Sequence, residues 1–417
     1  CLDATMTIPA APAPLSRKRR ILFVAEAVTL AHVARPRVLA QALDPARFET
    51  HLAAAPTFDT ALHGFCGRRW PLTSIPPARF MQALADGSPI YDAQTLTDYV
   101  EEDLALLDQV QPDLVVGDFR LSLAVSAPLR GVPYVALTNA HWSPYAALDR
   151  WPVPDLPFVH ILGERASIAL FNRVRPLVFW LHGRALNQVR QHYGLAPVGD
   201  MLHAYTWGDE TLYLDVPELI PTQTLPPDHR FIGPILWEPD TPTPAWWNAV
   251  PDGRPCVYLT LGSSGPARLL PRLITSLSRL PINLLVATVG RVNLGQLPAN
   301  VFAVNYLPGG AAARRSVLTL CNGGSGTVYQ SLAQGTPVLG IASNLDQHLT
   351  MHWVTAAGAG QTLRSERATP ARVMQAAEAM LAEPGWTAGA GRVAGWFNAQ
   401  SAVDTFSALV DARFQVE

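Results

Sequence analysis

The 417-residue sequence is poor in lysine, in paired cysteines and in long apolar runs. Lys18 is the single lysine among 31 basic residues, a bias typical of genomic base composition. No segment reaches the roughly 18 uninterrupted apolar residues of a membrane span. The four cysteines lie far apart, which favours neither a zinc site nor a disulfide framework. We interpret Cys1, Cys66, Cys256 and Cys321 as buried or free thiols and expect a cytoplasmic protein without stable membrane insertion.

Charge of one sign is also lacking. The formal net charge is −2 and the pI about 6.6, which argues against nucleic acid or an anionic membrane as the main partner. In contrast, 49% of the residues are hydrophobic and 15% charged, which excludes a disordered chain. A chain of this length favours two domains of roughly 200 residues each.

The N-terminal region superficially resembles a signal peptide, because the basic run Arg17-Lys18-Arg19-Arg20 precedes an apolar stretch. Glu26, His32 and Arg35 interrupt the apolar part, and no small-residue cleavage site follows at a suitable distance. We therefore predict a flexible arm over residues 1–20, with Met6 as a candidate native start.

Short apolar runs alternate with helical segments through the first half, which is typical of buried parallel strands in a doubly wound sheet. Strands are predicted at 21–25, 50–54, 114–116 and 134–137, with helices at 36–43, 99–110 and 122–129. Residues 142–198 differ, being rich in aromatics and largely helical. They could wall an apolar pocket, although core packing explains aromatics equally well.

A proline-rich stretch without periodicity, residues 217–255, marks a linker, after which the alternation starts again. Strands are predicted at 256–261, 283–288, 301–304, 317–320 and 338–341, with helices at 268–280, 327–334, 348–356, 370–383 and from 391 onward. The sequence thus predicts an N-terminal domain over 21–235, a linker over 236–254, a second domain over 255–395 and a C-terminal helix over 396–417. Ligands in such sheets bind beyond the carboxyl ends of the strands.

The segment from Cys321 to Thr327 is glycine-rich and lies between a strand and a helix. Glycines let the backbone approach a ligand closely, and a helix N-terminus offers free N–H groups to a diphosphate. The alternative is a turn that binds nothing. The segment is neither a P-loop nor the usual dinucleotide fingerprint. About twenty residues later, Asp346 and Gln347 could together hydrogen-bond adjacent sugar hydroxyls.

With these motifs in place, the sequence from residue 21 to about 397 resembles the family 1 glycosyltransferases of GT-B architecture, which include plant and bacterial natural-product enzymes. The resemblance rests on the glycine-rich turn, the Asp346-Gln347 pair and four further phrases. These are Leu212-Tyr213-Leu214-Asp215-Val216-Pro217, Ile232-Gly233-Pro234, Leu261-Gly262-Ser263-Ser264 and Tyr306-Leu307-Pro308. It implies an α/β fold of two Rossmann-like domains facing a central cleft, with the C-terminal helix packed back on the N-terminal domain.

The resemblance also implies the donor site. Gly324, Ser325, Gly326 and Thr327 would hold the diphosphate, and Asp346 and Gln347 the transferred sugar. Ser263 and Ser264 would lie near the donor, and Tyr306 and Leu307 near the base. Many members have His where this chain has Asn322, which can donate a hydrogen bond but carries no charge. No acidic metal-binding cluster is present, so we expect no metal and no cofactor beside the nucleotide-sugar co-substrate.

Transfer to an alcohol needs a base, and His suits that task near neutral pH. His32 lies in a predicted loop after the first strand, where the family has a catalytic His in a Gly-His-x-x-Pro phrase; here Ala31 precedes it, and one extra residue precedes Pro36. Asp118, at a strand end, would orient the imidazole. The alternatives are a surface or structural histidine and a helix N-cap aspartate.

We therefore expect an inverting transferase that moves a sugar from a UDP- or TDP-sugar to a hydroxyl of a small, largely apolar acceptor. Phe80, Trp142 and Tyr145 are the candidate acceptor contacts, chosen for their flat apolar faces. Three alternatives stay open: a nucleotide-sugar epimerase of the same fold, a non-catalytic nucleotide-sugar-binding partner protein, and membrane-associated glycolipid synthesis. The last needs an apolar or basic docking face, for which the overall charge offers little support.

Overall fold

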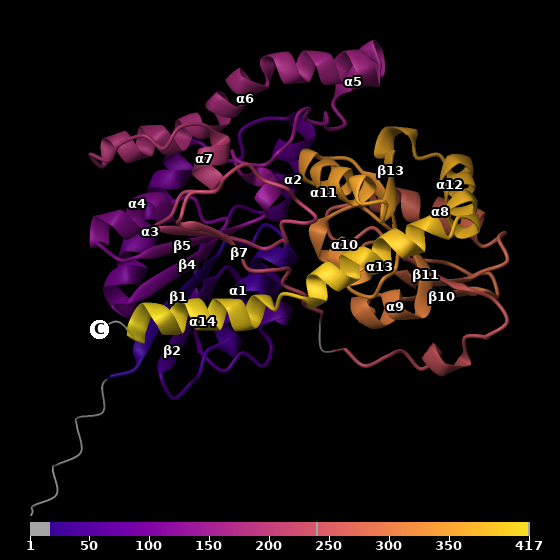
Figure 1. Ribbon diagram of the computed structural model, residues 1–417, viewed down its shortest axis with the longest axis horizontal. Helices are drawn as coiled ribbons and strands as arrows, with labels where there is room; N and C mark the ends of the chain where they lie inside the picture. Colours follow the sequence, from indigo (N-terminus) through magenta and orange to yellow (C-terminus); the bar gives the residue numbers. More distant parts are fainter. Residues whose placement is uncertain (1–16, 239–240, 416–417) are drawn as a thin grey trace, which may run out of the picture.

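The computed structural model describes residues 17–238 and 241–415, and it contains two parallel sheets, each covered by helices (Figure 1). The first sheet has the order β3-β2-β1-β4-β5-β6-β7. Its strands are β1 (Arg19–Ala25), β2 (Phe48–Ala54), β3 (Arg68–Pro71), β4 (Leu114–Asp118), β5 (Tyr134–Thr138), β6 (Glu210–Tyr213) and β7 (His229–Phe231). Most of β1 and all of β4 and β5 are buried, as expected for a sheet with helices on both faces.

The second sheet has the order β10-β9-β8-β11-β12-β13. Its strands are β8 (Cys256–Thr260), β9 (Asn283–Ala287), β10 (Val301–Val304), β11 (Ser316–Cys321), β12 (Val338–Ala342) and β13 (Gly360–Arg364). In both sheets the strand order reverses once, between β1 and β4 and between β8 and β11. Ligands of doubly wound sheets bind at such reversals, outside the carboxyl ends of the strands.

Helices connect most of the consecutive strands. The N-terminal half contains α1 (Leu30–Ala42), α2 (Pro77–Asp86), α3 (Ala93–Val110), α4 (Leu123–Arg130), α5 (Pro157–Leu162), α6 (Glu164–His192) and α7 (Met201–Tyr205). The C-terminal half contains α8 (Leu270–Leu277), α9 (Gly309–Arg315), α10 (Ser325–Leu332), α11 (Leu345–Ala356), α12 (Pro370–Ala382) and α13 (Gly385–Asn398). In residues 17–238 and 241–415, no helix combines the length and apolarity needed to cross a membrane.

The last helix, α14 (Ala402–Gln415), leaves the C-terminal half and lies against the N-terminal half (Figure 1). Phe406 and Val410 are buried in the core that surrounds β1, and the Phe406 ring lies 6.0 Å from that of Phe23. Asp411 forms an ion pair with Arg47 near its outer end. The prediction that the C-terminal helix packs back on the first domain is therefore confirmed, as is the two-domain α/β fold.

A half-buried carboxylate joins the two halves beside the cavity. Asp155 accepts hydrogen bonds from His348 at 3.0 Å and from Ser365 at 2.6 Å, and it lies 2.7 Å from the Arg364 guanidinium. Burial alone would raise the pKa of Asp155, but hydrogen bonds from His348, Glu366 and Ser365 lower it to about 2. The carboxylate is therefore charged at neutral pH and links the region before α5 to α11 and β13.

Several expectations for single elements were wrong. β1 begins at Arg19, so the predicted arm over residues 1–20 ends too late; residues 1–16, including Cys1 and Met6, lie outside the described residues. The proline-rich stretch 217–255, interpreted from the sequence as marking a linker, contains β7. Strand β13 and helix α9 were not predicted. These are short elements with weak periodicity, which neighbouring elements stabilise.

Candidate active site

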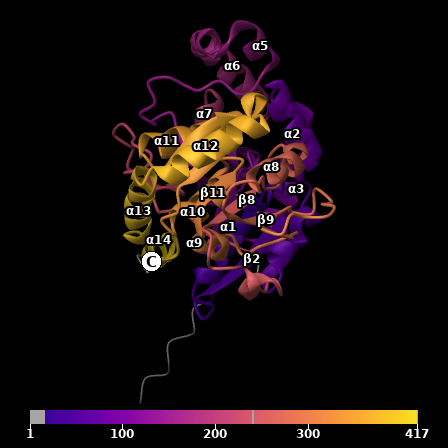
Figure 2. The same ribbon diagram turned by 90° about the vertical axis from the view of Figure 1, so that its right-hand side faces the viewer.

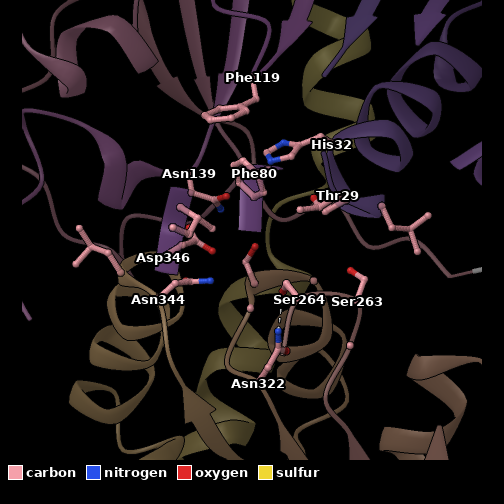
Figure 3. Close-up of a pocket in the computed structure, with 18 of the residues that line it drawn as sticks. Thr29, His32, Phe80, Phe119, Asn139, Ser263, Ser264, Asn322, Asn344 and Asp346 are labelled. Atoms are coloured by element: carbon pink, nitrogen blue, oxygen red, sulfur yellow. Dashed lines mark hydrogen bonds between the residues drawn. The ribbon is translucent and has the colours of Figure 1, made fainter. Parts of the chain in front are cut away.

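A cavity of about 570 Å³ lies between the two halves, and both contribute to its walls. Figure 3 shows His32, Phe119 and Asn139 of the N-terminal half on one side and Ser264 and Asn322 of the C-terminal half on the other. His32, Phe119, Ser264 and Asn322 follow the carboxyl ends of the strands at which the sheet order reverses, and Asn139 follows the adjacent strand β5. The prediction of a central cleft formed by facing loops is confirmed.

His32 and Asp118 lie side by side in this cavity. His32 Nδ1 is 2.6 Å from Asp118 Oδ1, although the two residues are 86 positions apart. The His32 side chain is 18% exposed, while Asp118 is fully buried at the end of β4. The His32 ring stacks on Phe119 with centroids 5.0 Å apart. The pair thus presents one face of an imidazole to the cavity and keeps its carboxylate away from water.

The 2.6 Å separation favours the tautomer that carries its proton on Nδ1, although the Nη2 of Arg35 also lies 2.8 Å from that nitrogen. A carboxylate oxygen and a nitrogen lone pair would repel each other at this distance, so the Nδ1 of His32 donates to Asp118. The Nε2 nitrogen of the neutral ring is then left with its lone pair. This is the tautomer that a general base requires.

His32 does not lie in a loop, as the sequence predicted, but in the first turn of α1. Pro36 lies within this helix and not at its start. Since proline lacks an N–H group, the carbonyl of His32 has no helical donor four residues later. The stretch between His32 and Pro36, one residue longer than in the family phrase, is accommodated within the helix and contains Arg35.

Arg35 is a site residue that the sequence did not reveal. Its Nε donates to Asp118 Oδ2 at 2.8 Å and its Nη2 to Oδ1 at 2.6 Å. Its Nη1 donates to Asn139 Oδ1 at 3.1 Å. Burial would raise the pKa of Asp118, but the charge of Arg35 and the hydrogen bonds from His32 and Arg35 outweigh burial and lower it. Asp118 therefore stays ionised, held by one guanidinium and one imidazole.

Asn139 extends this network to the C-terminal half. Its side-chain amide donates to Asp215 at 2.9 Å, and Asp215 also accepts from the Tyr329 hydroxyl of α10. Asp215 is fully buried, and Asn139 lines the cavity. The position of Asn139 directly after β5 was the available signal, because the ends of neighbouring parallel strands meet at one edge.

The glycine-rich turn lies opposite His32. Gly323 has a φ of +80°, which glycine adopts without strain, and Gly324 precedes the first residue of α10. Gly324, Ser325, Gly326 and Thr327 all line the cavity. The free N–H groups and the positive end of the α10 dipole therefore face the enclosed space, as an anion site requires.

Asn322 supports this turn. It is buried, and its side-chain nitrogen donates to Ser264 Oγ at 2.9 Å, shown as a dashed line in Figure 3. This hydrogen bond joins the loop after β8 to the loop after β11. Ser263, Ser264, Tyr306 and Leu307 also line the cavity, with Ser263 and Tyr306 exposed and Leu307 buried.

Asp346 and Gln347 have different surroundings although they are neighbours. Asp346 lines the cavity and accepts from Trp142 Nε1 at 2.8 Å and His141 Nε2 at 3.1 Å. Burial would raise the pKa of Asp346, but the hydrogen bonds from His141 and Trp142 lower it. Gln347 is buried and does not line the cavity; its Oε1 accepts from the Ser343 N–H at 2.9 Å and, in the capping box of α11, from the Asn344 N–H.

Of the three predicted acceptor contacts, two line the cavity and one does not. Phe80 and Trp142 line the cavity, whereas Tyr145 does not: its ring packs edge-on against His229, with centroids 5.3 Å apart. Residues 142–198, which the sequence offered as a possible wall of an apolar pocket, do contribute to the cavity through Leu156, Phe171, Val178 and Phe179. Phe119 and Met201 lie outside that segment and were not foreseen.

Comparisons with known proteins agree with this arrangement. The family model described as the C-terminal domain of erythromycin biosynthesis protein CIII-like proteins matches residues 272–403. A PGL/p-HBAD biosynthesis glycosyltransferase of Mycobacterium tuberculosis strain H37Ra is 48% identical over 379 residues, 90% of this chain and 88% of that protein. A PGL/p-HBAD biosynthesis rhamnosyltransferase of Mycobacterium bovis strain BCG is 48% identical over 396 residues, 94% of this chain and 88% of that protein.

Solved structures show the same fold. Spinosyn rhamnosyltransferase SpnG superposes with a TM-score of 0.69 at 21% identity, covering 94% of this chain and 99% of that one. Its complex with thymidine diphosphate superposes with a TM-score of 0.68 at 21% identity, over the same shares of the two chains. The 48% sequence identity to the mycobacterial enzymes extends over nearly the whole of both chains and is sufficient to assign the family. The chain belongs to the family 1 glycosyltransferases of GT-B architecture, the group that contains the natural-product glycosyltransferases.

Proposed function

We propose that this glycosyltransferase moves a deoxyhexose, with rhamnose as the first candidate, from a TDP- or UDP-sugar to a hydroxyl of a largely apolar acceptor, with inversion. The observation that carries the proposal is the His32–Asp118 pair, which shares one cavity with the glycine-rich turn. The names of the related rhamnosyltransferases and the thymidine diphosphate complex of SpnG support the choice of donor.

The proposed reaction is a single displacement. The Nε2 of His32 takes the proton of the acceptor hydroxyl while its oxygen forms a bond to the anomeric carbon. The bond between that carbon and the diphosphate oxygen breaks, and the nucleoside diphosphate leaves with the electron pair. Asp118 stabilises the imidazolium, and the N-terminus of α10 stabilises the leaving diphosphate. We further propose that this helix terminus makes a divalent metal unnecessary, so that a chelator leaves the rate unchanged.

A turnover assay tests the base. His32→Ala should lower kcat by about 10²–10⁴, the usual contribution of a general base, with little change in nucleotide affinity. His63→Ala, on an exposed histidine outside the cavity, is the matched control. Glycoside and free nucleotide are measured by mass spectrometry with phenolic, polyketide and sterol acceptors. Full activity of His32→Ala would exclude His32 as the base, and sugar-nucleotide conversion without acceptor would favour an epimerase.

A further inference from the structure

Exposed apolar side chains gather on one part of the molecule. Most of the large apolar residues that are exposed in residues 17–238 and 241–415 lie between positions 161 and 181. Ile161 is 83% exposed, Leu177 59% and Trp180 51%. They belong to α5 and α6, which lie at the upper edge of the molecule in both views (Figures 1 and 2). We name this surface the α5–α6 face: Ile161, Leu170, Val174, Leu177, Trp180 and Leu181.

The spacing on α6 places the exposed residues in one stripe. Leu170, Val174, Leu177 and Leu181 recur every three or four residues, which is the period of a single helix face. The opposite face of α6 is used for folding, since Phe171, Phe179, Leu186 and Val189 are buried there. The helix is thus apolar on two sides, and only one of them is covered by the rest of the chain.

The charges around this face have one sign. Between residues 156 and 192 the chain has five arginines and a single acid, Glu164, in a protein of net charge −2. Glu164 is already paired with Arg367 at 3.0 Å. Arg165, Arg173 and Arg184 are exposed. A leucine- and tryptophan-rich face accompanied by arginines is the composition of helices that lie in the interface of an anionic bilayer.

The α5–α6 face is continuous with the cavity. Leu170 and Val174 are exposed and also line the cavity. Farther in, Phe171, Val178 and Phe179 of the same helix belong to the cavity wall. An apolar path therefore runs from the outer surface of α6 toward the end of the cavity that holds His32.

We propose that the α5–α6 face docks on an anionic lipid bilayer, with Leu177 and Trp180 inserted among the lipids and the exposed arginines against the headgroups. The docking does not depend on the proposed function. A bilayer is favoured over a second copy of this chain or another protein, because the face combines exposed arginines with an apolar stripe that continues into the cavity wall.

Vesicle sedimentation tests the docking. The full chain should bind vesicles of phosphatidylcholine with phosphatidylglycerol and bind pure phosphatidylcholine more weakly. The double variant Leu177→Glu, Trp180→Glu should bind the anionic vesicles about tenfold more weakly or worse, since it removes two inserted apolar groups and adds two like charges. Val317→Glu, at an exposed valine of β11 outside the cavity, is the matched control and should bind like the unchanged chain. Thermal unfolding and nucleotide binding verify that both variants are folded.

A second double variant tests the electrostatic contribution to vesicle binding. Arg173→Glu, Arg184→Glu should abolish the preference for anionic vesicles. Equal sedimentation of the unchanged chain with and without vesicles would overturn the docking, as would light scattering that shows a dimer dissociated by the Leu177→Glu, Trp180→Glu variant.

Vesicle binding without transfer to any acceptor would contradict the proposed function and leave the docking standing. Transfer to soluble acceptors without vesicle binding would contradict this inference alone.

Discussion

In the C-terminal half, most of the polar groups that face the cavity come from short segments directly after β8, β10, β11 and β12. In the N-terminal half, the cavity wall combines segments from Thr29 to Ile235. The donor side consists largely of backbone and small polar groups, whereas the acceptor side consists of large apolar side chains. A diphosphate needs N–H groups at a fixed place, which a single turn supplies. An apolar acceptor needs surface area, which only distant segments together can supply. The predictions below test this difference, from the largest expected effect to the smallest.

In the N-terminal half, the arrangement of His32 and Asp118 depends on the ion pair between Arg35 and Asp118. Arg35→Met would leave Asp118 buried with His32 as its single partner, which should cost about 3–5 kcal/mol of unfolding free energy at pH 7 and lower kcat. The pKa of Asp118 is lowered in the native protein, so its stabilising contribution is present above the ordinary carboxyl pKa and lost as the pH falls through the lowered value. The difference in unfolding free energy between the unchanged protein and Arg35→Met should therefore become smaller toward acid pH.

Urea unfolding at several pH values measures this difference. Arg37→Met, at the neighbouring arginine whose guanidinium binds the carbonyl of Ala61, is the control and should show no comparable pH dependence. An Arg35→Met variant whose stability loss is the same at all pH values would contradict the role assigned to the ion pair.

Substitutions of the neighbours Asp346 and Gln347 should have different effects, one on donor affinity and the other on protein stability. Asp346→Asn keeps an acceptor oxygen for His141 and Trp142 but loses the charge, so we expect donor affinity to fall about tenfold to a hundredfold at unchanged stability. Gln347→Ala should instead lower stability by about 0.5–2 kcal/mol through loss of the cap of α11. Calorimetric titration with nucleotide-sugar and thermal unfolding distinguish the two. A direct sugar contact of Gln347 would appear as a loss of affinity larger than that of Asp346→Asn.

The glycine-rich turn should tolerate no side chain at Gly323. An added Cβ would lie 2.8 Å from Met351 Cγ, in a backbone with φ of +80°. Gly323→Ala should thus cost about 1–2 kcal/mol or more and weaken nucleotide binding. Gly391→Ala is the control, because a Cβ there meets open space inside α13; it should leave binding unchanged and raise stability slightly. Unchanged nucleotide affinity of Gly323→Ala would contradict a diphosphate site at this turn.

The smallest effects are expected among the acceptor aromatics. Phe80→Leu should raise the acceptor KM about threefold to tenfold, because a shorter side chain leaves part of the apolar wall unfilled. Tyr145→Phe should change kinetics and stability by less than about 0.5 kcal/mol, since Tyr145 lies outside the cavity. Steady-state kinetics with one phenolic acceptor compare the two. A larger effect at Tyr145 than at Phe80 would show that the acceptor is bound elsewhere.

The polar site was foreseen better than the apolar one, and particular residues explain why. His32 and the segment 324–327 follow strands and Asp118 ends one, so the rule that ligands bind beyond strand ends indicates their location, and the family resemblance supplied their expected roles. Arg35 was missed because nothing in its neighbourhood distinguishes it from a surface arginine until Asp118 is placed beside it. The α5–α6 face was missed because the net charge of the whole chain conceals a local excess of arginines.

The sequence by itself determined the two rounds of alternating strands and helices, the glycine-rich turn before α10 and the family. All of these depend on local periodicity and on short motifs. The tertiary structure alone decided that Asp118 lies between His32 and Arg35, that Gln347 caps a helix while Asp346 faces the cavity, and that one side of α6 stays uncovered. These are properties of side-chain direction and of contacts between distant segments, and local sequence carries no record of which segments meet.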